Sequence, residues 1–195
     1  MRRTITTLAL AAAAGIAATA NAGVTFSNVN ITGTLAAGAT WATGGAGDDI
    51  DFSFPSALVG DGQNLRSGVI TITFIAKSDT ALNLDKLGLS ILGGLLGSGT
   101  IIFNEVVEDL VNPGIIATYG VTLNSASQLP HTADIHFSRE STMVKVKKTL
   151  ILSAVDTQAF DLAGVALVEQ KLVPTPGAAA LLGMGVLAMG RRRRA

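Results

Sequence analysis

The sequence contains no cysteine, only one tryptophan and one tyrosine, and 14% charged residues, well below the roughly 25% of an ordinary soluble domain. Without cysteine, the fold cannot be held by disulfide bonds whatever the redox state around it, and a cysteine nucleophile is excluded. The sequence also lacks a nucleophile elbow, a zinc motif and a lysine-containing phosphate loop. Recognisable enzyme motifs are therefore missing, and we expect a protein that is not an enzyme.

The charges that are present are unevenly placed, although the formal net charge is zero. Six of the 14 basic residues lie at the two ends of the chain. Residues 23–173 carry 8 basic and 14 acidic side chains, and 8 − 14 gives a net charge of −6. Binding to nucleic acid needs a basic surface, so nucleic acid is excluded as a partner of this central region.

Residues 1–22 have the three parts of a secretory signal peptide. Arg2 and Arg3 precede an apolar stretch at residues 8–18, and Ala20-Asn21-Ala22 fits the small-x-small cleavage rule. The apolar stretch is shorter than the roughly 20 residues of a spanning helix. The pattern predicts an N-terminal signal helix, cleavage by signal peptidase after Ala22, and an exported protein.

Residues 23–173 alternate short β-rich runs with glycine and asparagine, which predicts one all-β domain. In the clearest run, Ile70, Ile72 and Phe74 share one face, and Thr71 and Thr73 make the opposite face more polar. A second run places Val144 and Val146 on one face and exposes the lysines at 145 and 147. The nine predicted strands are residues 24–31, 49–54, 68–79, 87–92, 99–107, 114–123, 133–138, 142–155 and 160–173.

Turn signals at short intervals separate these runs, and no long helical segment lies between them. This spacing favours an antiparallel β-sandwich, jelly-roll-like, over a parallel sheet. Residues 101–110 fit either a strand or a short helix, because their apolar residues satisfy both periods. The aromatic residues expected in the core are Trp41, Phe26, Phe52, Phe54, Phe74, Phe103 and Phe137.

The most suggestive polar cluster is Asp48, Asp49 and Asp51, which follow a glycine-rich turn. Carboxylate oxygens on a turn suit Ca²⁺, although the spacing is not that of an EF-hand. A solvated acidic turn before a strand is the alternative. The sequence therefore offers a calcium site here as a hypothesis, and no other cofactor.

Two further groups of residues have chemistry that a site could use. His131, Asp134 and His136 lie close together, but a metal site would need another ligand, and a polar edge strand explains them equally. A glycosidase needs two carboxyl groups at a set separation, which scattered acids cannot show from sequence. The acids considered for that role are Asp79, Asp85, Glu105 and Glu108.

Residues 174–195 end the chain with prolines, an uncharged apolar run at 178–190 and Arg191, Arg192, Arg193 and Arg194. As a helix, 178–190 would extend about 20 Å, which is short for the roughly 30 Å hydrocarbon core of a bilayer. The arginines would hold the end on the cytoplasmic side. This segment suits transient membrane retention better than a permanent anchor.

The order of these parts resembles the PEP-CTERM sorting signal of exported bacterial proteins. The matching residues are Val173-Pro174-Thr175-Pro176-Gly177, then the apolar helix, then the four arginines. The family has glutamate where this chain has Thr175. The resemblance implies processing by exosortase, a transpeptidase-like membrane protease, and a mature protein at the cell surface or in an extracellular, exopolysaccharide-associated matrix.

Three functions follow from this reading. The first is a non-enzymatic structural or adhesive surface protein, with signal peptidase, exosortase and the membrane as transient partners and exopolysaccharide as a lasting one. The second is a lectin-like carbohydrate-binding module, with or without calcium at Asp48, Asp49 and Asp51. The third is a glycan hydrolase on the same sandwich scaffold.

Overall fold

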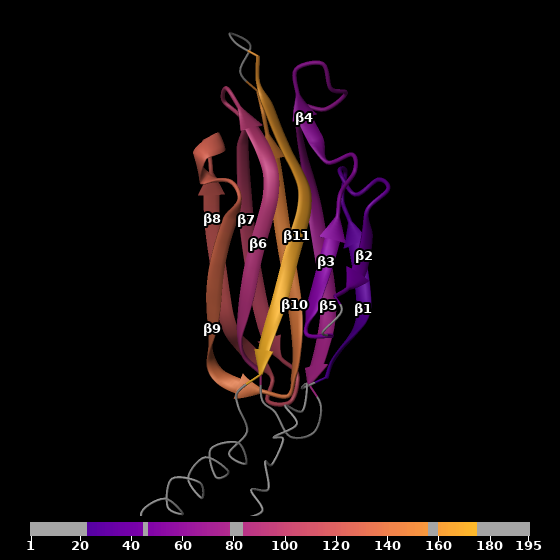
Figure 1. The fold of residues 1–195 in the computed structure, drawn as a ribbon, viewed down its shortest axis with the longest axis vertical. Helices are drawn as coiled ribbons and strands as arrows, with labels where there is room; N and C mark the ends of the chain where they lie inside the picture. Colours follow the sequence, from indigo (N-terminus) through magenta and orange to yellow (C-terminus); the bar gives the residue numbers. More distant parts are fainter. Residues whose placement is uncertain (1–22, 45–46, 79–83, 156–159, 175–195) are drawn as a thin grey trace, which may run out of the picture.

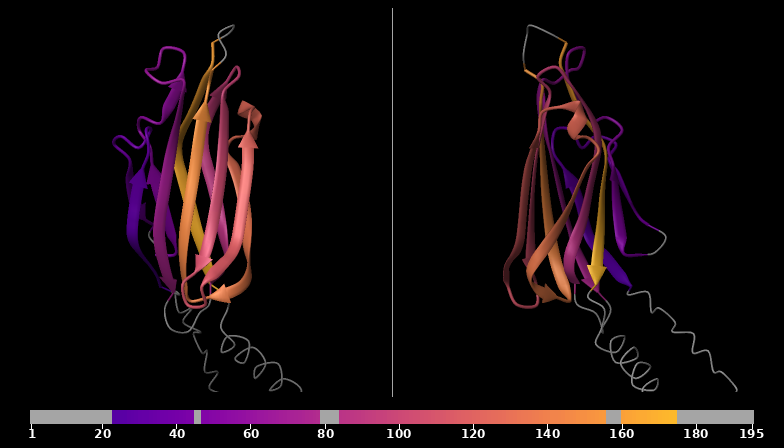
Figure 2. Two further views of the ribbon diagram at one scale, coloured as in Figure 1. Left: turned by 180° about the vertical axis from the view of Figure 1, so that it is seen from behind. Right: turned by 60° about the vertical axis from the view of Figure 1, so that its left-hand side comes forward.

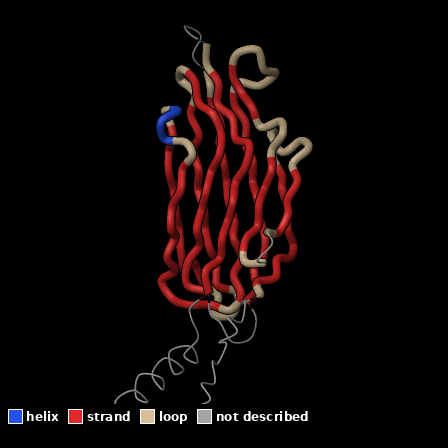
Figure 3. Tube along the Cα trace, in the orientation of Figure 1, coloured by secondary structure: helices blue, strands red, loops and turns tan. Residues whose placement is uncertain are grey.

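The computed structural model describes residues 23–44, 47–78, 84–155 and 160–174, and within them the chain folds into two antiparallel β-sheets packed face to face (Figures 1 and 2). Strands account for nearly all of the regular structure (Figure 3). No helix among the described residues is long and apolar enough to cross a membrane. The expected antiparallel sandwich is confirmed, whereas the two terminal helices lie outside the described residues and the finer jelly-roll assignment stays a prediction.

The first sheet, sheet A, has five strands in the order β1-β5-β10-β7-β8. Every neighbouring pair in it is antiparallel, and β5 and β10 are paired in register over eleven residues. The bounds of its strands are β1 Val24–Thr32, β5 Ser67–Ser78, β7 Thr100–Asp109, β8 Gly114–Leu123 and β10 Met143–Ser153.

The second sheet, sheet B, has the order β2-β3-β11-β6-β9, and the short strand β4 also pairs with β11. A 3-10 turn, η1 (Ala126–Gln128), precedes β9 and is capped by Ser125. The bounds of its strands are β2 Thr40–Thr43, β3 Asp49–Ser53, β4 Leu58–Gly60, β6 Leu84–Leu96, β9 His131–Ser141 and β11 Leu162–Pro174.

Alternation along the central strands of sheet A builds the core between the sheets. Ile70, Ile72 and Phe74 of β5 are at most 1% exposed, while Thr71 and Thr73 of the same strand lie on the half-buried outer face. The predicted faces of this strand are confirmed. Because both sheets turn an apolar face inward, the core is one continuous layer of aliphatic and phenylalanine side chains.

Strand β10 follows the same rule with one exception. Val144 and Val146 are buried, and Lys145 and Lys147 are exposed, as the sequence predicts. The period of two then places Lys148 on the inner face as well, where its side chain is fully buried. A charged residue at an inward position is the one feature of this strand that the alternation of apolar residues does not predict.

All nine predicted runs are strands, and residues 101–110 are resolved in favour of a strand, since β7 continues to Asp109. The two short strands β2 and β4 are not predicted from the sequence.

The prediction that Trp41 belongs to the core is wrong: it is 46% exposed on the edge strand β2. Of the six phenylalanines expected in the core, four are buried and two, Phe26 and Phe137, pack against the core from its margin.

Both ends of the domain lie at the same end of the sandwich (Figure 1). Val24 of β1 pairs with Ser78, the last residue of β5, and Pro174 of β11 pairs with Leu84, the first residue of β6. The loops at the opposite end are therefore the part of the domain farthest from Val24 and Pro174.

Replacing Phe74 by alanine tests the core. Its ring packs against Phe26 and Phe52, with ring centroids 5.9 and 5.7 Å away. We expect Phe74→Ala to lower the free energy of unfolding by about 4 kcal/mol, measured by urea denaturation followed by circular dichroism. Trp41→Ala is the control and should cost less than about 1 kcal/mol, because half of that ring is already in water. Equal losses would contradict this account of the core.

Candidate functional site

The outer face of sheet B carries a polar depression of about 280 Å³. Three strands at the centre of the sheet supply its residues. The lining residues are Asp49 and Asp51 of β3, Gly88, Leu89 and Ser90 of β6, and Glu169, Gln170 and Lys171 of β11.

The register of the strands explains why these residues meet. Glu169 of β11 pairs with Asp51 on one side and with Ser90 on the other. Two residues further along β11, Lys171 pairs with Asp49 and with Gly88. Paired residues in antiparallel strands project from the same face, so the two rows form one polar block.

The depression is acidic. Burial raises the pKa of the Asp51 carboxyl above its usual value, and repulsion from Glu169 and then Asp49 raises it further. The lysine at the rim, Lys171, forms an ion pair with Asp48, with 3.4 Å between Nζ and Oδ2. The carboxylates within the depression can therefore accept hydrogen bonds from hydroxyl groups or attract a cation.

Gly88 keeps the middle of the depression open. A Cβ at this position would make only ordinary contacts, at 3.7 Å from Lys171 Cβ and 3.9 Å from Asp134 Oδ1. Its backbone has the ordinary negative φ of a strand residue. A side chain here would fill the depression without straining the sheet.

A second, apolar depression of about 410 Å³ lies further along the same two strands, β6 and β11. Leu92 and Leu58, which line it, are 36% and 38% exposed. Leu92 pairs with Leu167, which is two residues before Glu169 on β11. The outer face of sheet B thus passes from a polar hollow to an apolar one along the strand direction.

A buried polar cluster lies directly beneath the polar depression. Lys148 of β10 and Glu105 of β7 are paired across sheet A, with 2.7 Å between Nζ and Oε2, and both are fully buried. Lys148 Nζ also donates to Oε1 of Gln170, which points inward from β11 of the opposite sheet. Gln170 Nε2 in turn donates to the backbone oxygen of Gly88 at 3.0 Å.

The surroundings of this cluster are apolar. Lys148 Nζ lies 5.5 Å from the centroid of the Phe103 ring. Burial lowers the pKa of the Lys148 amine below its usual value, and the neighbouring Glu105 opposes that change. In the sequence, Glu105 is one of several scattered acids, and no motif marks Lys148 or Gln170 as its partners.

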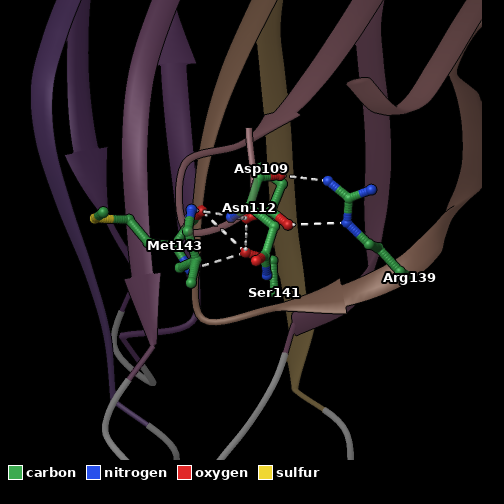
Figure 4. Close-up of polar contacts among 6 residues, drawn as sticks. Asp109, Asn112, Arg139, Ser141 and Met143 are labelled. Atoms are coloured by element: carbon green, nitrogen blue, oxygen red, sulfur yellow. Dashed lines mark hydrogen bonds and ion pairs between the residues drawn. The ribbon is translucent and has the colours of Figure 1, made fainter. Parts of the chain in front are cut away.

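A third polar cluster surrounds Asp109 at the end of β7 (Figure 4). Its buried carboxylate accepts hydrogen bonds from the backbone of Val111 and Asn112, from Ser141 Oγ at 2.7 Å and from Arg139 Nε at 3.0 Å. These bonds hold the β7–β8 turn against the end of β9. Although burial alone would raise it, the hydrogen bonds, led by that of Ser141, lower the pKa of Asp109 to about 2.

Asp109→Asn tests this cluster through its pH dependence. The folded-state pKa of about 2 lies below the ordinary value of 3.8, so the stabilisation is complete above roughly pH 4 and is lost as the pH falls towards 2. We expect the variant to unfold about 2 kcal/mol more easily than the wild type near pH 7. In urea denaturation at about pH 2, the difference should largely disappear.

Asp134→Asn is the matched control, because Asp134 pairs with Lys86 at the surface and its side chain is 60% exposed. Asp134→Asn should lower the free energy of unfolding by less than about 0.5 kcal/mol at either pH. A pH-independent difference between Asp109→Asn and the wild type would contradict the role assigned to the carboxylate.

The three aspartates of the calcium hypothesis do not all line the polar depression. Asp49 and Asp51 face the polar depression, whereas Asp48 precedes the strand and pairs with Lys171. Among the described residues, no three histidine, aspartate or glutamate side chains are grouped so as to hold a metal ion. A calcium site at Asp48, Asp49 and Asp51 stays a prediction that would need these side chains to rearrange.

The other groups singled out from the sequence are dispersed where the structure describes them, and the side chains of Asp79 and Asp85 lie outside the described part. His131 stacks on Tyr119, with 2.7 Å between Nε2 and the hydroxyl oxygen, while Asp134 and His136 lie exposed on the same strand. Glu105 is buried in the core, whereas Glu108 is at an outward position on the same strand. These two acids therefore do not converge on one cleft.

Most of the predicted processing residues lie outside the described part of the chain. Val173 and Pro174 are the last two residues of β11. The remaining residues of the sorting motif and of the signal cleavage site, all outside the described ranges, are Ala20, Ala22, Thr175, Pro176, Gly177, Arg191, Arg192, Arg193 and Arg194.

Comparison with known proteins gives distant structural likenesses alone. No protein-family model and no curated protein sequence matches the chain. Among solved structures, TmCBM61 in complex with β-1,4-galactotriose is 12% identical with a TM-score of 0.39, over 75% of this chain and 90% of that one. A family 11 carbohydrate-binding module from Clostridium thermocellum, in complex with a β-1,3-1,4-mixed-linked tetrasaccharide, is 13% identical with a TM-score of 0.29, over 83% of this chain and 92% of that one.

Proposed function

We propose that the outer face of sheet B binds a glycan and that the domain is a non-enzymatic binding module. The observation that carries this proposal is the succession of a polar and an apolar depression along β6 and β11. A sugar ring offers hydroxyl groups at its edge and C–H groups on its face. Carboxylates such as Asp51 and Glu169 accept hydrogen bonds from hydroxyls, and the exposed leucines can cover the C–H groups.

The charge of the site indicates the class of glycan. Asp49, Asp51 and Glu169 gather on one face, and the nearby Lys171 is already paired with Asp48. These carboxylates would repel an anionic polysaccharide but not a neutral one. The ligand we propose is therefore a neutral, hydroxyl-rich chain long enough to cross from one depression to the other.

Gly88→Val tests the proposal by filling the polar depression. Valine suits a strand, and its Cβ would make only ordinary contacts, so the fold should be kept. The wild type is first screened on a broad array of neutral glycans to find the one that it binds most tightly. We expect Gly88→Val and Asp51→Asn each to weaken binding to that glycan about tenfold or more. Isothermal titration calorimetry would measure the change.

Glu108→Gln is the matched control, because Glu108 is a comparable acid facing outward from the opposite sheet. It should leave affinity unchanged. The same titration with a chelator present separates a calcium-dependent site at the aspartates from direct recognition. Absence of binding to every glycan, or an equal loss in the Glu108→Gln control, would sink the proposal.

The second part of the proposal concerns location: the chain is exported, held transiently by its C-terminal segment and processed near Pro174 to reach the cell surface or matrix. Support comes from the three-part order of residues 174–195 and from the matching order of residues 1–22. The fold is compatible with a tether, because Val24 and Pro174 leave the domain at the same end (Figure 1).

Intact-mass measurement of the protein recovered from producing cells tests this location. We expect a chain that begins at Gly23 and lacks Arg191 to Arg194, because the signal and the arginine cluster are both removed. A Pro174→Ala, Pro176→Ala double variant should keep its C-terminus, while Pro113→Ala, in the β7–β8 turn, should be processed as the wild type is. Recovery of wild-type chains that all retain the arginines would rule out this processing.

A further inference from the structure

The buried cluster of Lys148, Glu105 and Gln170 brings three reactive groups together inside the sandwich. The amine of Lys148 contacts the carbonyl oxygen of the Gln170 amide, one bond away from its Cδ. The carboxyl of Glu105 lies 2.7 Å from the same amine. All three side chains are fully buried, so water does not compete for them.

We propose that Lys148 and Gln170 form an intramolecular isopeptide bond, with Glu105 as the catalytic residue that moves the proton. The lone pair of Lys148 Nζ attacks Gln170 Cδ, the new C–N bond forms, and the bond from Cδ to Nε2 breaks. The products are a secondary amide joining β10 to β11 and one molecule of ammonia.

Glu105 balances the protons of this step. When the shared proton is on the carboxyl, Lys148 is a neutral amine and a nucleophile. As the C–N bond forms, Nζ gives up one proton to the carboxyl, and the carboxyl gives one to Nε2, which leaves as ammonia. Glu105 is regenerated, and no oxidant, reductant or cofactor is consumed.

The environment favours the reactive protonation state. Burial lowers the pKa of the Lys148 amine, which makes its neutral form more accessible. The Phe103 ring lies beside the amine and keeps the site apolar. In addition, Glu105 Oε1 is buried and has no hydrogen-bond partner among the described residues, so one carboxyl oxygen stays available for the proton.

The amide nitrogen that would leave as ammonia is hydrogen-bonded to the backbone of sheet B. Gln170 Nε2 donates to the backbone oxygen of Gly88, and both residues line the polar depression on the outer face of sheet B. The amide nitrogen is therefore held by the backbone of sheet B, while the amide oxygen faces the attacking amine.

Trypsin digestion of the full wild-type chain, after denaturation, tests the bond directly. An acylated Lys148 is not cut, and no other lysine or arginine lies between it and Lys171. We expect a looped peptide of residues 148–171 that is lighter than its linear sequence by about 17 Da, the mass of ammonia. Cleavage before Asp156 and Asp161 by a second protease should leave the fragment with Lys148 joined to the fragment with Gln170.

Three variants assign the roles. Gln170→Met removes the acyl group and Glu105→Gln removes the proton carrier, and both should give the linear peptide 149–171. Lys145→Met, an exposed lysine on the same strand, should keep the looped peptide. Circular dichroism of each variant shows whether it has folded, and the result for the wild type does not depend on any variant folding.

Other outcomes would overturn the proposal. A wild-type chain that is cut after Lys148 and shows no mass loss contains no isopeptide bond. A loss of about 18 Da, with Lys148 joined to Glu105 instead, would make the glutamate the acyl donor and Gln170 a bystander. A looped peptide in Glu105→Gln would remove Glu105 from the chemistry.

Discussion

The burial of apolar side chains between the two sheets is the interaction on which every other feature of this domain depends. The chain has no cysteine, so each sheet is stabilised chiefly by covering the inner face of the other. Residues such as Ile72, Phe74 and Val168 are almost completely enclosed there. Because the inner faces provide this stabilisation, the outer faces can hold acids, lysines and glycines. Residues of these kinds form the polar depression.

The buried lysine is an exception that the core has to accommodate. An isolated charge in such a layer would be strongly unfavourable, and even a buried ion pair contributes little to stability once its desolvation is counted. Lys148 and Glu105 on sheet A, together with Gln170 on sheet B, form a polar contact between the two sheets within the core. A covalent bond at this point closes the chain between β10 and β11, as a disulfide would, and such a loop stabilises a fold by about 3 kcal/mol.

The fold was largely predictable, because period-two alternation is a local signal. It identified the faces of β5 and β10 correctly, and it missed β2 and β4, whose three or four residues are too few to show a period. The site was predictable only in part. Asp49 and Asp51 stood out as neighbours in sequence, but their partners Ser90 and Glu169 come from distant strands, and only the register of the sheet brings them together. The same alternation places Lys148 at an inward-facing position of β10. Because a charged residue is not expected in a core, the sequence does not predict its burial.

Because β1 begins and β11 ends at the same end of the sandwich, the length of the strands sets how far the domain extends from that end. Strand β11 has 13 residues, and at about 3.3 Å per residue it runs for about 40 Å from the end at which both termini leave. The long axis of a domain attached by that end extends away from its support, and the loops at the other end lie farthest from the support. The outer face of sheet B is then perpendicular to the support. Long polymers that lie between neighbouring domains would contact this face.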